Sequence, residues 1–246
     1  MDKIVIIKSA DDNVLLPSIS LKFSCYNDIP IVNETENNMV KFYKNKIDDN
    51  RDWDKGKKLS NEYELIHLPN KNYKSESISK YEPLSRSYFK LWEILTDLEL
   101  IPKETIGSKK YVTLCEGPGG FIEALVNWKK MYTMERDEIY AITLKSTDKD
   151  IPGWKKSNIF LSNNSNVKVS YGEDNTGNIY RLENMKHFFQ EFNLNKDVEI
   201  ITADGGFDFS QDFNNQETLS YQIIFCEIVM ALSCQKVGGS FICKFF

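Results

Sequence analysis

Residues 111–121 read Tyr-Val-Thr-Leu-Cys-Glu-Gly-Pro-Gly-Gly-Phe, an apolar run that leads directly into a turn of glycine and proline. The apolar run predicts a short buried strand, and residues 121–130 return to helical spacing. Glycines let a backbone pass close to a ligand, and the first turn of the next helix offers unpaired N–H groups and a positive dipole end. We therefore expect a strand–loop–helix unit whose loop cradles a small anionic or carboxylate-bearing cofactor. A tight turn without a ligand is the alternative.

The sequence on both sides of this loop alternates between strand and helix patterns. We expect helices at 84–98, 121–130, 183–192 and 217–233, and strands at 111–115, 139–144, 167–171, 198–203 and 239–246. Strands that alternate with helices of this length form βαβ units, so the expected fold class is α/β, with a mostly parallel sheet between two layers of helices. Ligands bind such sheets outside the carboxyl ends of the strands.

The N-terminal part of the chain has a different pattern. Strand-like runs at 3–7 and 14–23 precede a polar, turn-rich stretch at 33–60. We interpret residues 1–75 as a small N-terminal extension of unknown role, and residues 76–246 as the α/β domain.

Composition limits the classes of protein that fit this chain of 246 residues. With 41% hydrophobic and 13% aromatic residues it can bury a sizeable core. Apolar runs are too short for a membrane span, and the N-terminus is charged too early for a signal peptide. Five scattered cysteines indicate reduced thiols and an intracellular protein. Two histidines give little material for a His-based metal site or a Ser/His/Asp triad.

The charge balance bears on RNA binding. The net charge of −5 counts against it, because phosphate recognition needs Lys and Arg. A local excess of basic residues lies between 71 and 90 (Lys71, Lys74, Lys80, Arg86 and Lys90), although a solvated lysine face is the commoner explanation for such a cluster.

Unusual residues follow three of the other expected strands. Residues 143–145, Thr-Leu-Lys, carry no acid where a dinucleotide-binding unit holds its ribose, which disfavours an NAD enzyme. Asp204 ends the 198–203 strand before two glycines, which predicts a carboxylate beside a ligand; a capping Asp is the alternative. Lys244 has apolar neighbours in a strand that we expect to be buried, so its ammonium would be poorly solvated and suited to a general base. A lysine that reaches solvent from the strand end is the alternative.

These segments together resemble the FtsJ-like RNA 2′-O-methyltransferases, and within them the cap-specific subgroup of eukaryotes and large DNA viruses. The resemblance rests on the order and spacing of 85–91 (Ser-Arg-Ser-Tyr-Phe-Lys-Leu), 116–121, 203–206 (Ala-Asp-Gly-Gly) and 238–244 (Gly-Gly-Ser-Phe-Ile-Cys-Lys). The shorter runs at 143–145, 171–173 (Tyr-Gly-Glu) and 216–217 (Gln-Glu) add to it.

The resemblance implies a Rossmann-like methyltransferase fold and a specific reaction. A methyl group would pass from S-adenosylmethionine, which leaves as S-adenosylhomocysteine, to a ribose 2′-hydroxyl on the first transcribed nucleotides of capped mRNA; ribosomal or transfer RNA is the alternative substrate. No metal is required. The compartment would be the cytoplasm, or a viral factory or virion for a viral protein, with the nucleus as the alternative.

The resemblance also assigns residues. Of the family's Lys-Asp-Lys-Glu tetrad, Lys90, Asp204 and Lys244 match the first three places. Lys244 would take or orient the hydroxyl proton, with Lys90 as the second cation near it and Asp204 orienting both Lys244 and the methyl group. Cofactor contacts are implied for the positions that match the family's binding segments: Ser85, Glu116, Gly117, Pro118, Gly119, Gly120, Phe121, Asn178, Ile179 and Asp204. Asn178 departs from the pattern, because the cap enzymes commonly have an acid there.

The family's tetrad glutamate and last strands come after the central lysine, and this chain stops at Phe246. We therefore expect strand 239–246 to be an exposed apolar edge, completed by a further segment or a partner. A non-catalytic module that binds cofactor or RNA is the alternative function. The aromatic residues that could stack on a nucleobase are Tyr73, Tyr81, Trp92, Phe207 and Phe209, and the sequence does not choose among them.

Overall fold

The computed structural model describes residues 33–48, 51–52, 56, 60–67, 77–102, 107–132, 137–145, 151, 153–206 and 216–245. The strands expected at 3–7 and 14–23 lie outside these residues. The chain divides into two compact units, Met1–Asp48 and Asp49–Phe246. The domain boundary expected near residue 75 stays a prediction.

A parallel sheet forms the centre of the second unit. Its strands are β1 (Lys110–Leu114), β2 (Glu138–Ile142), β3 (Val167–Ser170), β4 (Val198–Ala203) and β5 (Gln235–Cys243), in the order β3-β2-β1-β4-β5. All neighbouring pairs are parallel. The chain builds outward from β1 to β3 and then returns to place β4 on the other side of β1, so β1 and β4 flank the point where the strand order reverses. The expected α/β, Rossmann-like fold is confirmed.

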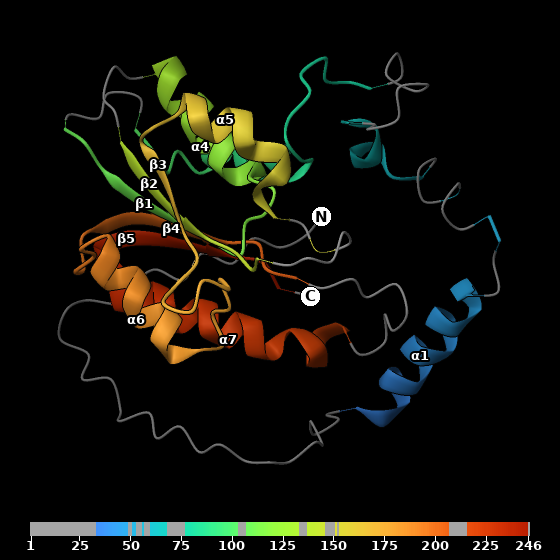
Figure 1. Ribbon diagram of the computed structural model, residues 1–246. Helices are drawn as coiled ribbons and strands as arrows, with labels where there is room; N and C mark the ends of the chain where they lie inside the picture. Colours follow the sequence, from blue (N-terminus) through green and yellow to red (C-terminus); the bar gives the residue numbers. More distant parts are fainter. Residues whose placement is uncertain are drawn as a thin grey trace. The chain divides into compact units, whose positions relative to one another are not determined.

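Helices cover both faces of the sheet (Figure 1). On one face lie α4 (Gly120–Tyr132) and α5 (Asn158–Asn163), and on the other lie α6 (Leu182–Glu191) and α7 (Gln216–Cys234). Helix α3 (Ser87–Asp97) packs against α4. Two short 3-10 helices, η1 (Glu62–Leu65) and η3 (Trp154–Ser157), complete the described elements of this unit.

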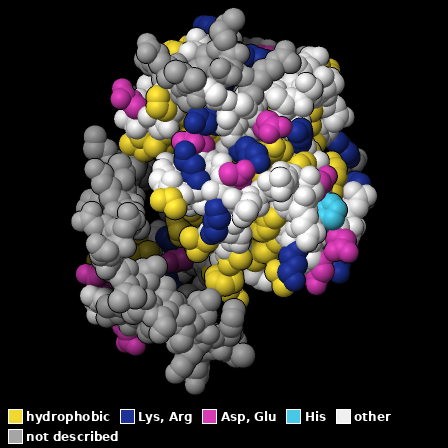
Figure 2. Space-filling view, turned by 90° about the vertical axis from the view of Figure 1, so that its left-hand side faces the viewer, with side chains coloured by type: hydrophobic (Ala, Val, Ile, Leu, Met, Phe, Trp, Pro, Cys, Tyr) yellow, Lys and Arg dark blue, Asp and Glu magenta, His cyan; other side chains and the backbone are white. Residues whose placement is uncertain are grey.

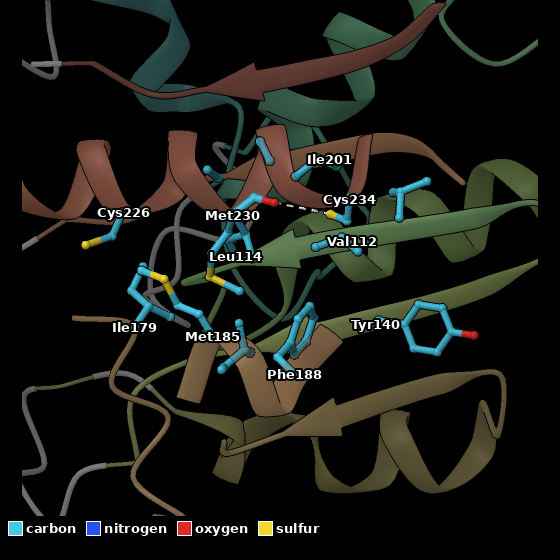
Figure 3. Close-up of a cluster of buried hydrophobic side chains, with 14 of the residues drawn as sticks. Val112, Leu114, Tyr140, Ile179, Met185, Phe188, Ile201, Cys226, Met230 and Cys234 are labelled. Atoms are coloured by element: carbon cyan, nitrogen blue, oxygen red, sulfur yellow. Dashed lines mark hydrogen bonds between the residues drawn. The ribbon is translucent and has the colours of Figure 1, made fainter. Parts of the chain in front are cut away.

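The apolar core has two parts because successive side chains of a strand point to opposite faces. Val112 and Leu114 of β1 join one cluster with residues of α6 and α7, whereas Tyr111 joins the other with residues of α3 and α4. The first cluster is drawn in Figure 3, where Met185 and Phe188 of α6 face Met230 of α7 around the end of β1.

Two expectations about local structure were wrong. Residues 33–60 were expected to be turn-rich, yet α1 (Glu34–Asp48) is a helix. It lacks glycine and proline, and the Asn33 side chain caps it by accepting a hydrogen bond from the Glu36 N–H (3.1 Å). The burial expected for the strand before Lys244 was also wrong: β5 is at the end of the described sheet order, next to β4, and most of its side chains are half-exposed, which agrees with the expected edge position.

Positive and negative side chains are mixed on the described surface of the protein. On the face of the molecule in Figure 2, Lys and Arg lie among Asp and Glu. Ion pairs join Lys110 to Asp197 (2.6 Å) and Lys168 to Glu138 (2.8 Å). Within the described ranges, none of the helices has the length and apolar character needed to cross a membrane.

Candidate functional site

The candidate site is built on the loops that follow β1, β4 and β5. Leu114 pairs with Ala203, and Ala203 pairs with Cys243, so three neighbouring strands end in register. The residues that come next leave the sheet side by side. This arrangement brings Glu116, Asp204 and Lys244 to one place at the carboxyl edge.

Asp204 and Lys244 form the centre of the site. The Lys244 ammonium lies 2.9 Å from Asp204 Oδ1 as an ion pair, and it donates a hydrogen bond to the Asp204 backbone carbonyl (3.0 Å). The Lys244 N–H continues the β5 ladder by donating to the Ala203 carbonyl (3.0 Å). The side chains are 29% and 14% exposed, so the pair is sheltered but reachable. Lys244 follows an edge strand, which explains why its ammonium is less buried than the sequence indicated.

Glu116 is buried beneath this pair and holds the start of α4. Its carboxylate accepts hydrogen bonds from the N–H groups of Phe121 (2.9 and 3.0 Å) and Ile122 (3.1 Å). The expectation that these N–H groups are unpaired was therefore wrong. Burial is the main cause that raises the pKa of Glu116 to about 8; the hydrogen bonds from Phe121 and Ile122 oppose this rise, the charge of Asp204 adds to it, and the Lys244 ammonium opposes it.

The glycine loop packs tightly against the start of α3. Gly119 has a φ of +107°, a conformation that side chains rarely allow. A Cβ on Gly120 would collide with Ser87 Oγ and lie 2.5 Å from Ser85 Oγ. The loop is thus closely approached by the Ser85 hydroxyl, and Gly117 and Pro118 are its half-exposed residues.

A second loop, at 171–180, approaches the first through Thr143. The Gly117 N–H donates weakly to Thr143 Oγ1 (3.4 Å), and a Cβ on Gly177 would collide with the Thr143 carbonyl oxygen. Asn178 follows, and its side-chain oxygen accepts a hydrogen bond from the Tyr180 N–H (2.9 Å). Ile179 is only 3% exposed and packs in the core beside Met185 (Figure 3).

Lys90 does not join the Asp204–Lys244 pair through a contact among the described residues. It is an exposed residue of α3, and within the described residues neither a hydrogen bond nor an ion pair joins it to Asp204 or Lys244. Its side chain instead lines a separate pocket on the outer face of α3.

Glu227 of α7 was not expected at the site from the sequence. This carboxylate is fully buried, and it accepts a hydrogen bond from the Gly205 N–H (3.1 Å) directly after Asp204. Cys243, directly before Lys244, has its sulfur 3.8 Å from Glu227 Oε2. Burial raises the pKa of Glu227 to about 7, and the hydrogen bonds and the Lys244 charge oppose this rise. The sequence did contain a signal for this buried acid, because Glu227 is the single charged residue in the otherwise apolar run at 223–231.

Across the part of the chain that the structure describes, there is no group of three or more His, Cys, Asp or Glu residues placed to hold a metal ion.

Comparison with known proteins identifies the family. Residues 83–246 match the model of the family described as FtsJ-like methyltransferase. Cap-specific mRNA (nucleoside-2′-O-)-methyltransferase 1 of Mus musculus is 33% identical over 60% of this chain, and the Homo sapiens protein of the same name is 34% identical over 55%. Cap-specific mRNA (nucleoside-2′-O-)-methyltransferase 2 of Danio rerio is 30% identical over 69%.

The matched segments are small parts of these relatives, at 17%, 16% and 23% of their respective lengths. A crystal structure of a Plasmodium falciparum protein, provisionally assigned as a ribosomal RNA methyltransferase, aligns with 66% of this chain and 78% of its own at 20% identity and a TM-score of 0.43.

Proposed function

This chain belongs to the family of FtsJ-like methyltransferases, and from that premise we propose that it transfers a methyl group from S-adenosylmethionine to a ribose 2′-hydroxyl of RNA. The observation that carries the proposal is the Asp204–Lys244 pair, held at the point where the strand order reverses and within reach of the glycine loop.

The residues around the glycine loop fit the proposed cofactor. Gly120 has no room for a side chain, and Gly117 and Pro118 present half-exposed backbone at the carboxyl edge of the sheet. Asn178 lies at the same edge of the sheet, because the residue before it, Gly177, packs directly against the backbone of Thr143. When bound, S-adenosylmethionine supplies an electrophilic methyl group on a sulfonium. Gly117, Gly119, Gly120 and Asn178 would hold it.

Lys244 and Asp204 would act on the ribose. Transfer of the methyl group to the 2′-oxygen would form an O–C bond, break the methyl–sulfur bond with release of S-adenosylhomocysteine, and require the hydroxyl proton to leave. Lys244 is the group placed to take or orient that proton. Asp204 holds the ammonium through both its carboxylate and its backbone carbonyl, which restricts where the nitrogen can point. Positioning and electrostatics would therefore supply most of the catalysis.

Capped mRNA is the substrate that we propose. It is supported by the names of the relatives from mouse, human and zebrafish, which are cap-specific mRNA methyltransferases. Lys90, which matches the first tetrad position, is proposed to contact the bound RNA. Ribosomal or transfer RNA is the alternative substrate, and the experiment below distinguishes it from capped mRNA.

Methyl transfer and cofactor binding test the proposal separately. Isothermal titration calorimetry should detect S-adenosylmethionine binding but no NAD binding, and radiolabelled methyl groups should reach capped RNA in preference to uncapped RNA of the same sequence. Lys244→Ala should abolish transfer and keep the binding heat. Lys168→Ala, which removes another ion-paired lysine at the far edge of the sheet, should change neither.

Each contrary result has a defined meaning. Absence of S-adenosylmethionine binding would overturn the cofactor. Binding without transfer by the wild-type chain would overturn catalysis and leave a binding module. Equal methylation of uncapped RNA would overturn cap specificity, and turnover by Lys244→Ala would overturn the role of Lys244.

A further inference from the structure

A pocket of about 180 Å³ lies on the outer face of α3. One wall comes from η1 and the two residues after it, with Tyr63, Ile66 and His67. The other wall comes from the start and the exposed side of α3, with Arg86, Phe89, Lys90 and Glu93. A cavity of about 150 Å³ suffices for a benzene ring, so this volume suits one aromatic ring system with part of its surface in solvent.

The α3 wall of the pocket follows from helix geometry. Arg86, Phe89, Lys90 and Glu93 are spaced i, i+3, i+4 and i+7, so all four lie on one side of the helix. The phenyl ring of Phe89 is thereby flanked by two cations and one carboxylate. His67 comes from the opposite wall, with its ring centroid 6.1 Å from that of Phe89.

Among the residues that the structure describes, Lys90 has no partner that neutralises its charge. Within the described residues it makes neither an ion pair nor a hydrogen bond, although Glu93 is one helical turn away. Tyr63 is 69% exposed, so the face of its ring is available at the pocket mouth. Aromatic faces next to an uncompensated cation are what a stacked base and its phosphate require.

The pocket and the candidate site share the first turn of α3. Ser85 and Ser87 approach Gly120 of the glycine loop, and Arg86 between them lines the pocket. An RNA strand whose ribose lies at the glycine-loop side of this turn would meet the pocket along the same helix.

The other aromatic residues that the sequence left open are less suitable where they are described. The Tyr81 hydroxyl donates to Glu123 Oε1 (2.6 Å) and accepts from Asn127 (2.9 Å). Trp92 packs between Tyr88 and Trp128. Tyr73, Phe207 and Phe209 lie outside the described residues.

We propose that this pocket binds the base of an RNA nucleotide that neighbours the methylated one, with the base stacked on Tyr63 and His67 and the adjoining phosphate paired with Lys90. The side-chain oxygens of Glu93 would accept hydrogen bonds from the N–H edge of the base. This inference rests on the proposed function, since it assigns a substrate subsite to that reaction.

The test is the affinity of the 246-residue chain for a fluorescein-labelled single-stranded RNA hexamer, measured by anisotropy. Loss of one stacked base weakens binding by about 5-fold or more, so Tyr63→Ala and His67→Ala should each show that loss. Tyr63→Phe should bind as the wild type does. Leu232→Ala, which truncates a similarly exposed apolar side chain (63%) near the end of α7, is the matched control and should also be unchanged.

Two further measurements separate base from phosphate binding. An abasic RNA hexamer should bind the wild type and Tyr63→Ala equally, because neither complex contains the stack. Lys90→Gln should reduce the slope of log affinity against log salt by about 0.7, whereas Tyr63→Ala should leave that slope unchanged.

The outcomes distinguish this inference from the proposed function. Wild-type affinity in both Tyr63→Ala and His67→Ala, in a chain that binds S-adenosylmethionine and methylates RNA, would overturn the pocket and leave the reaction standing. An equal loss for the abasic hexamer would also overturn base stacking. A wild-type chain that binds no RNA would overturn the pocket together with the proposed function, whatever its affinity for S-adenosylmethionine.

Discussion

Replacement of Glu227 by glutamine should make the protein markedly more stable at alkaline pH and leave it nearly unchanged at acidic pH. Glutamine has the shape of the protonated carboxyl, and its side-chain oxygen can still accept the Gly205 N–H hydrogen bond. The substitution therefore removes the ionisation and keeps the contact.

The size of the effect follows from burial of the carboxylate. A rise of the Glu227 pKa from 4.5 to about 7 means that the ionised form costs about 3 kcal/mol in the folded state. A group with a raised pKa adds a stability that is fully present below the unfolded pKa and is lost as pH rises through the folded pKa. The wild type should thus lose about 3 kcal/mol from this group between about pH 4.5 and pH 8, and Glu227→Gln should not.

Urea unfolding at pH 5 and pH 8.5 measures this difference directly. At pH 8.5 the variant should exceed the wild type by about 3 kcal/mol, which corresponds to about 6–12 °C in Tm for a domain of this size. Glu116, whose pKa is about 8, titrates in both proteins, so the difference between them isolates Glu227. Glu183→Gln, at the exposed start of α6, is the control and should differ from the wild type by less than about 0.5 kcal/mol at both pH values.

Two results would refute the reasoning. An equal difference between variant and wild type at both pH values would mean that Glu227 does not ionise in this range. A variant that loses stability at pH 8.5 would mean that the carboxylate is held by a cation strongly enough to outweigh its burial.

Three further substitutions test the packing of the site and its support. Gly205→Ala should destabilise the protein by about 1–3 kcal/mol in urea unfolding, because the added Cβ would collide with the Glu227 carboxylate and lie 2.8 Å from Ile223 Cδ1. Unchanged stability would mean that the Glu227 carboxylate does not lie against Gly205. Gly120→Ala should weaken S-adenosylmethionine binding in calorimetry by pushing on Ser87, and wild-type affinity would separate this glycine from the cofactor loop. Lys129→Met should lower the free energy of unfolding by about 3–5 kcal/mol in urea, because it removes the ammonium that lies 2.7 Å from the buried carboxylate of Asp137. A loss below about 1 kcal/mol would contradict burial of this ion pair.

The sheet and the central pair of the site could be predicted from sequence because their signals are local. Apolar runs at 111–115 and 198–203 are short and bounded by turns, and each became a strand within one residue of its expected limits. In a parallel sheet the carboxyl ends of neighbouring strands lie together, so Asp204 and Lys244 could be placed at one edge before their contact was known. The order of the motifs identified the same family that the comparison shows.

Other features depended on contacts that a local pattern does not contain. Helix α1 does carry apolar residues at helical spacing, with Met39, Val40 and Tyr43, but the strongly polar sequence around them was interpreted as turn-rich. The N–H groups of Phe121 and Ile122 could have faced a ligand, and it is the return of the Glu116 side chain that occupies them.

By itself, the sequence determined the fold class and the loops at which chemistry can occur, because hydrophobic periodicity and turn residues act over a few positions. Only the tertiary structure decided which charged side chains contact one another at those loops. Packing of α7 under the sheet places Glu227 against Gly205, although 22 residues separate them. Packing of α3 on α4 places Lys90 in the lining of a pocket that it shares with Tyr63 and His67. Burial and proximity are properties of the packed chain, and they set which carboxyl groups resist ionisation and which cation is left for a substrate.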